Sequence, residues 1–352
     1  MAQSISLHSG SPLMGSPVIF RVVANDLSLI SHLAAHKVYL SVEIDMVSSD
    51  RAKETYEFSV PIAQEGESVS VDMDISSALR AYADDYEYTP LVSVGTSITY
   101  PIFRAKLQAW DTYMRDGISQ QSGLVVLQQY YYFLLGQFTD SERQRSGLLR
   151  GVNTLTRKPA SGELVAPYTS LYVSPLYYAY SSESFFNGIQ PAAPETEAFG
   201  TEELDANALN TIEGRSVWVS DSDEDPFVQF QFVNGYGVLE SAFAMCLPEV
   251  SVEKEVQEYS VTVPMAFNKV DRAVTLKRAS RHVFKMSSGP VTEEWQAWWQ
   301  EEFLNTKQAW MYYKQGWIPV SIVPDDTTKG IDYTKNDLAS VEFEVKLNIE
   351  GV

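Results

Sequence analysis

The last third of the chain constrains the fold most, because it contains one amphipathic segment and, after it, three short apolar or alternating runs. Residues 291–305 carry aromatic side chains at the spacing i, i+3, i+4, i+8, which is one face of a helix: Trp295, Trp298, Trp299 and Phe303. The runs 310–313 and 317–323 and the alternating tail 339–349 are typical of β-strands. We therefore expect a helix packed on strands, with these aromatic residues, Trp310 and Trp317 in a core.

The first hundred residues predict a β-sandwich. Four short segments rich in β-branched and aromatic residues and partly alternating, 18–24, 37–46, 55–60 and 68–73, are separated by turn-prone stretches. In the second of them Val38, Leu40, Val42 and Ile44 face one way. A short helix is predicted after Asp74, which is a good N-cap. Its buried face is indicated by four residues at helical spacing: Ile75, Ala78, Leu79 and Tyr82.

The middle of the chain gives weaker signals. Residues 91–110 return to β, and 123–138 form either a helix or a pair of strands, with the aromatic cluster 130–133 and Gly136 favouring strands. Residues 185–213, acidic and nearly without periodicity, predict a long exposed loop. Further strands are expected at 171–180, 217–219, 227–233, 238–246 and 259–263.

These elements predict a mainly β protein with two β-sandwich-like domains and a few short helices. The polar, glycine-containing stretch 111–122 suggests the division. We place an N-terminal β-sandwich domain at 1–115. A larger β-rich domain at 116–352 carries the long acidic loop and the C-terminal helix–strand unit.

The net charge of the chain excludes some classes of binding partner. The chain has 26 basic and 46 acidic residues, a net charge of −20. Such a surface repels phosphate backbones and anionic lipid headgroups, so we expect neither nucleic acid nor membrane as a partner. Residues 1–17 lack the pattern of a secretory signal, and the longest apolar stretch, 124–138, is too short and interrupted to span a bilayer. A soluble protein made in the cytosol is expected.

Two groups of residues have the spacing of metal ligands. His32 and His36 lie at i, i+4, but neither a Glu after His32 nor a third ligand accompanies them, so a surface loop or helical turn is favoured. Asp221, Asp223 and Asp225 alternate like calcium ligands. Pro226 and Phe232 stand where an EF-hand needs Gly and Glu, so a solvated acidic turn is favoured.

Catalytic chemistry has few candidates. Paired carboxylates flank the Trp helix, as in glycosidase clefts: Glu293, Glu294, Glu301 and Glu302. The first two also suit the positive end of a helix dipole, and packing accounts for the tryptophans. The one cysteine, Cys246, lies in an apolar run, and we predict that it is a small buried hydrophobic residue. Nucleophile elbows, phosphate loops and dinucleotide fingerprints are absent, so we predict no enzyme, catalytic residues, metal or cofactor.

Several segments resemble structural tail proteins encoded by phages and prophages of Bacteroidetes. Residues 232–240, Phe-Val-Asn-Gly-Tyr-Gly-Val-Leu-Glu, resemble a strand followed by Asn-x-x-Gly-x-x-Glu in those proteins. Residues 303–307, 317–320 and 338–347 resemble their terminal helix, Pro-Val strand and last strand, and 71–79 is similar in the same way. The resemblance covers under half of the chain and implies β-sandwich domains that assemble as rings or adaptors around a tail axis.

From this resemblance we expect a virion structural protein, a subunit of a tail or baseplate-like assembly that binds copies of itself and other tail proteins. Tyr, with 20 residues in clusters, suits protein interfaces. One alternative is a cell-surface or carbohydrate-binding protein, which requires solvent-facing tryptophans among 295, 298, 299 and 317. Another is a hydrolase using the carboxylates of residues 293–302.

Overall fold

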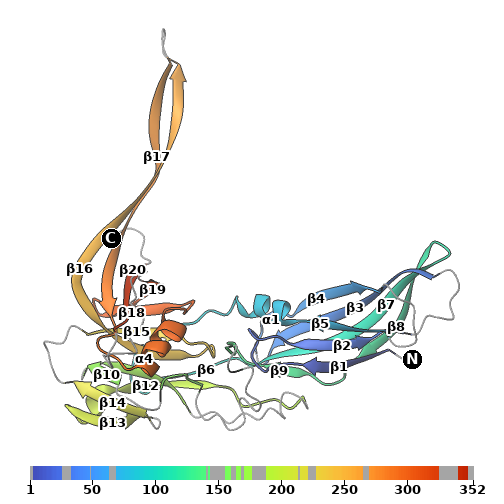
Figure 1. Cartoon of the computed structure of the whole chain (residues 1–352), viewed down its shortest axis with the longest axis horizontal. Helices are drawn as coiled ribbons and strands as arrows, with labels where there is room; N and C mark the ends of the chain where they lie inside the picture. The colour runs from blue at the N-terminus through green and yellow to red at the C-terminus, as the bar shows by residue number, and fades with distance from the viewer. Residues whose placement is uncertain are drawn as a thin grey trace.

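The computed structural model describes residues 3–25, 33–47, 49–62, 69–139, 142, 155–159, 164–167, 170–176, 188–212, 215–220, 227–264, 269–324 and 340–347. The molecule is elongated, with a sandwich of two sheets at one end, a closed barrel at the other, and a long two-stranded arm rising from the barrel (Figure 1). The mainly β fold with a Trp-rich helix near the C-terminus is confirmed.

The N-terminal sandwich packs a three-stranded sheet on a five-stranded one. The small sheet has the order β1-β2-β5, with strands β1 (Ser4–Ser9), β2 (Ile19–Val23) and β5 (Ser70–Asp74). The large sheet has the order β4-β3-β7-β8, from strands β4 (Glu54–Pro61), β3 (Leu33–Met46), β7 (Phe103–Arg115) and β8 (Ile118–Val126), and its fifth strand, β9 (Tyr131–Phe133), pairs with β7. Alternate residues of β3 and β7 are buried between the sheets, as the period-2 pattern predicts.

Helix α1 (Ser76–Ala83) is the helix predicted after Asp74, and its four apolar residues are buried. The cap lies one residue later than expected, at Ile75. Asp74 still stabilises the helix start, because its carboxylate accepts hydrogen bonds from the N–H groups of Ser76 (2.9 Å) and Val18 (3.2 Å). The same side chain therefore ties α1 to the small sheet.

Residues 123–138 contain the end of one strand and a second short strand rather than a helix. β8 pairs with β7, and the short β9 (Tyr131–Phe133) also pairs with β7 farther along. The division expected after residue 115 falls in the turn of the β7–β8 hairpin. The large sheet therefore continues past it, and the sandwich core extends to Phe138 and Leu155.

The prediction of a long loop at residues 185–213, between the sandwich and the barrel in the sequence, is wrong. Residues 188–212 are not one long loop: they contain β12 (Glu195–Gly200), a 3-10 turn η1 (Thr201–Glu203) and β13 (Ala208–Ile212). β12 lies between β11 (Leu171–Pro175) and β6 (Ser97–Thr99), while β13 pairs with β14 (Arg215–Ser220), which also binds β10 (Leu164–Pro167). β12 escaped prediction because its buried positions are Thr196, Ala198 and Gly200, small residues without an apolar signal.

Six strands close the barrel in the order β15-β16-β17-β20-β19-β18. They are β15 (Phe227–Val233), β16 (Leu239–Pro264), β17 (Lys269–Ser287), β18 (Ala309–Tyr313), β19 (Gly316–Pro324) and β20 (Glu342–Leu347). Helix α4 (Glu293–Trp298) and the π-helical turn η2 (Trp299–Phe303) pack on the barrel core. Trp295, Trp298 and Trp299 are buried as predicted, whereas Trp317 is only partly buried.

The two long strands β16 and β17 continue beyond the barrel as a ribbon, here called the arm. It comprises residues 251–264 of β16 and 269–282 of β17. β15 pairs with β16 only as far as Met245, and β20 pairs with β17 only from Val283 onward. Within the described residues the arm strands thus pair only with each other (Figure 1). None of the described helices is long and apolar enough to cross a membrane.

Candidate functional site: the joint between sandwich and barrel

The turn that connects β15 to β16 is the centre of the joint between the two units. Asn234 organises it, because its side-chain oxygen accepts the N–H groups of Tyr236 (3.0 Å) and Val238 (3.3 Å). The side-chain nitrogen of Asn234 donates to the carbonyl of Leu155 (2.8 Å) and to Glu240 (3.3 Å). The side-chain amide of Asn234 therefore supplies hydrogen-bond partners to the backbone of the turn and also binds residues 155–159, which we call the strap, to this turn.

Glycines let the sandwich backbone approach this turn closely. At Gly136, φ is +90°, and an added Cβ would lie 2.3 Å from the backbone carbon of Tyr236. At Gly237, φ is +75°, and an added Cβ would lie 2.5 Å from the Cβ of Leu135. The N–H of Gln137 then donates to the carbonyl of Gly235 at 2.8 Å. Side chains larger than hydrogen would push the two units apart.

Arg157 of the strap is the main cation of the joint. Its guanidinium donates to both carboxylate oxygens of Glu142 (2.8 and 2.7 Å), to Glu302 and to the carbonyl of Gln137 (2.7 Å). It also lies 4.3 Å from the centre of the Tyr236 ring. Its side chain is only 14% exposed, so these bonds form in a poorly hydrated setting.

The two carboxylates that share Arg157 respond differently to burial. Burial raises the pKa of Glu302, although Arg157 and the N–H of Gly235 (2.7 Å) act against it. Burial acts in the same direction on Glu142. Hydrogen bonds from Arg157 and from the Tyr236 hydroxyl (2.7 Å) outweigh it and hold the pKa of Glu142 below its usual value.

Lys158, the next residue of the strap, contacts strand β16 of the barrel with its side chain. Its ammonium lies 3.7 Å from Glu240, with both side chains 1% exposed, and donates to the carbonyl of Ser241 at 2.7 Å. Its nitrogen is 4.9 Å from the centre of the Tyr172 ring and 5.4 Å from that of Trp298. Consecutive residues of one strap thus place cations on two buried carboxylates of the C-terminal unit.

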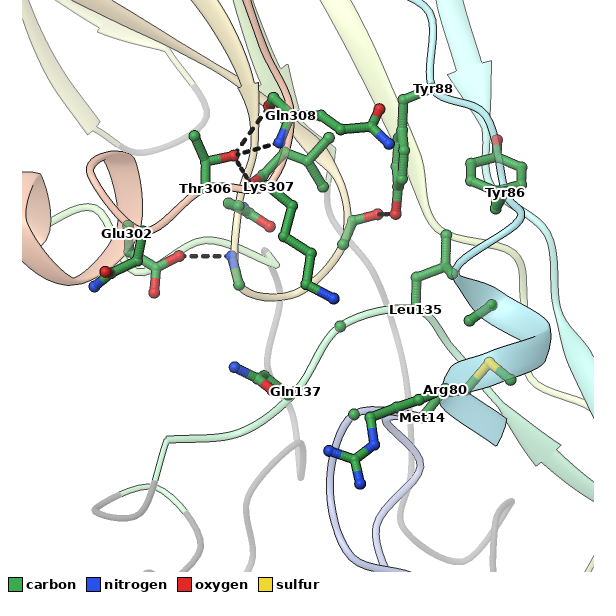
Figure 2. Close-up of a pocket in the computed structure, with 18 of the residues that line it drawn as sticks. Met14, Arg80, Tyr86, Tyr88, Leu135, Gln137, Glu302, Thr306, Lys307 and Gln308 are labelled. Carbon is green, nitrogen blue, oxygen red and sulfur yellow. Dashed lines mark hydrogen bonds between the residues drawn. The ribbon is translucent and has the colours of Figure 1, made fainter. Parts of the chain in front are cut away.

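A pocket of about 280 Å³ opens beside this joint. Its walls come from α1, the loop after β9, the 234–237 turn and the residues that follow η2 (Figure 2). The lining combines apolar groups such as Met14 and Leu135 with the cations Arg80 and Lys307. Lys307 pairs with Asp84 at 3.3 Å, and Glu302 bonds to the turn rather than standing free in the space (Figure 2).

The structure separates the carboxylates considered for hydrolysis. Glu302 is buried in the joint and occupied by Arg157 and Gly235. Glu301 is exposed and lines the pocket, whereas Glu293 and Glu294 are exposed in the first turn of α4 and do not line it. The four do not form an acid–base pair across one cleft. The burial of Trp295, Trp298 and Trp299 likewise leaves the helix without a sugar platform.

Most of the residues considered as metal ligands cannot be placed in the structure. Asp221, Asp223, Asp225 and His32 lie outside the described residues. Among the residues described, no group of three or more acidic, His or Cys side chains could hold a metal. Cys246 is partly buried and free, and burial raises the pKa of its thiol.

His36 is buried in the sandwich, not in a surface loop. A bulge in β3, with Ala35 at φ +51°, and a second bulge in β8 opposite Trp110 and Asp111 flank a polar cluster. The His36 ring nitrogen Nε2 lies 3.8 Å from an Asp111 oxygen. Asp111 is fully buried and accepts the backbone and side-chain N–H groups of Asn25 at 2.8 and 2.7 Å.

This cluster predicts a pH dependence. Burial raises the pKa of Asp111, while hydrogen bonds from Asn25 and the nearby His36 oppose the rise. A folded-state pKa above the unfolded value of about 3.9 gives stability that is complete at lower pH and lost as the pH rises through the folded pKa. In a His36→Gln background, urea unfolding from about pH 4 to about pH 7 should show the Asp111 protein losing stability relative to the Asp111→Asn variant. Parallel pH profiles would contradict it.

Sequence reasoning missed the residues that make the joint. Arg157 and Lys158 lie in a polar segment without periodicity, and nothing in the sequence pairs them with Glu302 and Glu240. The available signal was the segment 232–240, whose Asn, two Gly and Glu are all used in the turn. Comparison with models of protein families gave no match, and comparison with curated protein sequences gave none either.

Proposed function

We propose that this chain is a structural subunit of a phage tail or baseplate-like assembly and that it works by homo-oligomerisation and docking to other tail proteins. The observation that carries the proposal is the arm, which extends beyond the barrel with both edges unpaired among the described residues (Figure 1). A two-stranded ribbon in water is marginally stable by itself. The arm therefore fits an element that packs on a neighbouring molecule.

The composition of the arm supports docking. Its register pairs Tyr259 with Val274 and Val263 with Val270, so apolar residue types stand opposite one another toward the far end. Exposed strand edges with such residues are hazards for aggregation, and proteins that keep them use them as binding elements. A rigid joint between sandwich and barrel would hold the arm at a fixed angle to the rest of the subunit.

Removing the arm tests the proposal. Ser251 and Val283 are paired, so joining them through Asn-Gly replaces the arm by a two-residue hairpin turn and leaves every barrel pairing intact. We expect the shortened protein to fold, with the far-ultraviolet spectrum of a β protein and a cooperative unfolding transition, but to lose assembly, alone and with co-expressed neighbouring gene products. Light scattering and electron microscopy measure the assemblies. Assemblies of unchanged size without the arm would refute the proposal.

A further inference from the structure

The arm differs in charge from the chain that carries it. It contains six basic and four acidic residues, against 26 and 46 in the whole chain. Five of the six lie on its β17 strand, beside a single acidic residue, Asp271: Lys269, Arg272, Lys277, Arg278 and Arg281. The net negative charge of the protein therefore resides outside the arm.

Resting on the proposed function, we propose that the arm docks through its basic β17 strand on the acidic body of a second copy of this chain. A body that is strongly acidic attracts a basic strand and repels another acidic body. The arm is thus the part of one copy whose charge complements the rest of another. Exposed carboxylates on the body include Glu87, Glu202, Glu293 and Glu301.

Because arm and body are different surfaces, the contact can repeat from copy to copy. A contact between two different surfaces makes a ring when its rotation closes. Attraction between exposed charges is also screened by salt, since the Debye length falls from about 10 Å at 0.1 M to about 3 Å at 1 M. Assembly through the arm should weaken as salt is added.

The register identifies basic positions that can be reversed without placing like charges opposite one another. Arg272, Lys277 and Arg278 pair with Val261, Gln257 and Val256, none of which is acidic. Arg281 is left unchanged because its partner is Glu253. The test variant is Arg272→Glu, Lys277→Glu and Arg278→Glu together.

A matched control makes the same charge change off the arm. Lys37→Glu, Arg115→Glu and Lys314→Glu together reverse three exposed cations, of which Arg115 forms a surface ion pair with Asp116. Such pairs contribute little to stability, so this protein should fold normally. It separates the effect of arm charge from the effect of net charge.

Sedimentation and light scattering of the purified full-length chain test the inference. We expect self-association at about 50 mM salt that weakens at least about tenfold at about 500 mM. The arm variant should lose association to a similar degree, whereas the control keeps more of it. Mixed with the unchanged chain, the arm variant should end growing oligomers, because its acidic body still accepts an arm.

Two results would overturn the inference and leave the proposed function standing. One is an unchanged chain that stays monomeric at low salt yet assembles with neighbouring gene products through the arm. The other is an arm variant that self-associates like the control, while deletion of the arm abolishes assembly. If deletion of the arm has no effect on any assembly, the proposed function fails as well.

Discussion

Arg157→Met is expected to lower the free energy of unfolding by about 3–5 kcal/mol, because it leaves the buried Glu302 and the partly buried Glu142 without their cation. Glu142 and Glu302 both bond to this guanidinium, and Glu302 is 4% exposed. Urea unfolding followed by circular dichroism measures the loss. Because the joint connects the units, the transition should also become less cooperative, with sandwich and barrel unfolding at different urea concentrations.

Two further variants isolate the cause. Arg21→Met removes a guanidinium that bonds to both oxygens of Asp72 on the surface, so it should change stability little. Adding Glu142→Gln and Glu302→Gln to Arg157→Met removes the uncompensated charges and should recover much of the loss. If Arg157→Met costs no more than Arg21→Met, the joint does not depend on this ion pair.

Trp299→Ala is expected to cost about 3–5 kcal/mol, as large-to-small changes of buried aromatic residues do. The indole is 1% exposed and lies among Trp298, Phe303 and Phe343, with ring centres 5.4, 4.7 and 5.8 Å away. Its removal opens a cavity where α4 and η2 meet the barrel. The near-ultraviolet circular dichroism of the clustered tryptophans should fall with the urea midpoint.

Trp317→Ala is the matched control for this change. Trp317 is partly buried and packs edge-to-face on Tyr312, which is 46% exposed. Less apolar area is withdrawn from water there, so the loss should be clearly smaller. Equal losses for the two substitutions would mean that the helix does not pack on the barrel as the structure has it.

Periodicity was a reliable guide where one face of an element is buried. Alternation predicted β3 and β20, and helical spacing predicted the buried faces of α1 and α4. It failed at β12, where small side chains fill the inward positions and the sequence reads as an acidic loop. The division at residue 115 followed a polar, glycine-containing stretch, and such stretches also make hairpin turns.

The candidate site was hardly predictable, because the bonds that tie the strap to the barrel join distant parts of the chain. Arg157 and Glu302 are 145 residues apart, and Thr156 and Glu240 are 84 residues apart. Helical spacing sets Glu302, three residues after Trp299, on the apolar face, whereas Glu301 beside it is exposed. Only the packing of η2 against the 234–237 turn gives Glu302 its partners Arg157 and Gly235.

By itself the sequence determined the β class, the two amphipathic helices and the acidic charge, since each depends on residue type and short-range spacing. The tertiary structure decided the closure of the barrel, the buried ion pairs of the joint and the projection of the arm. The arm shows the physical reason. Within it only residues 259–263 were predicted as a strand, and whether a third strand covers that ribbon depends on where β15 and β20 end.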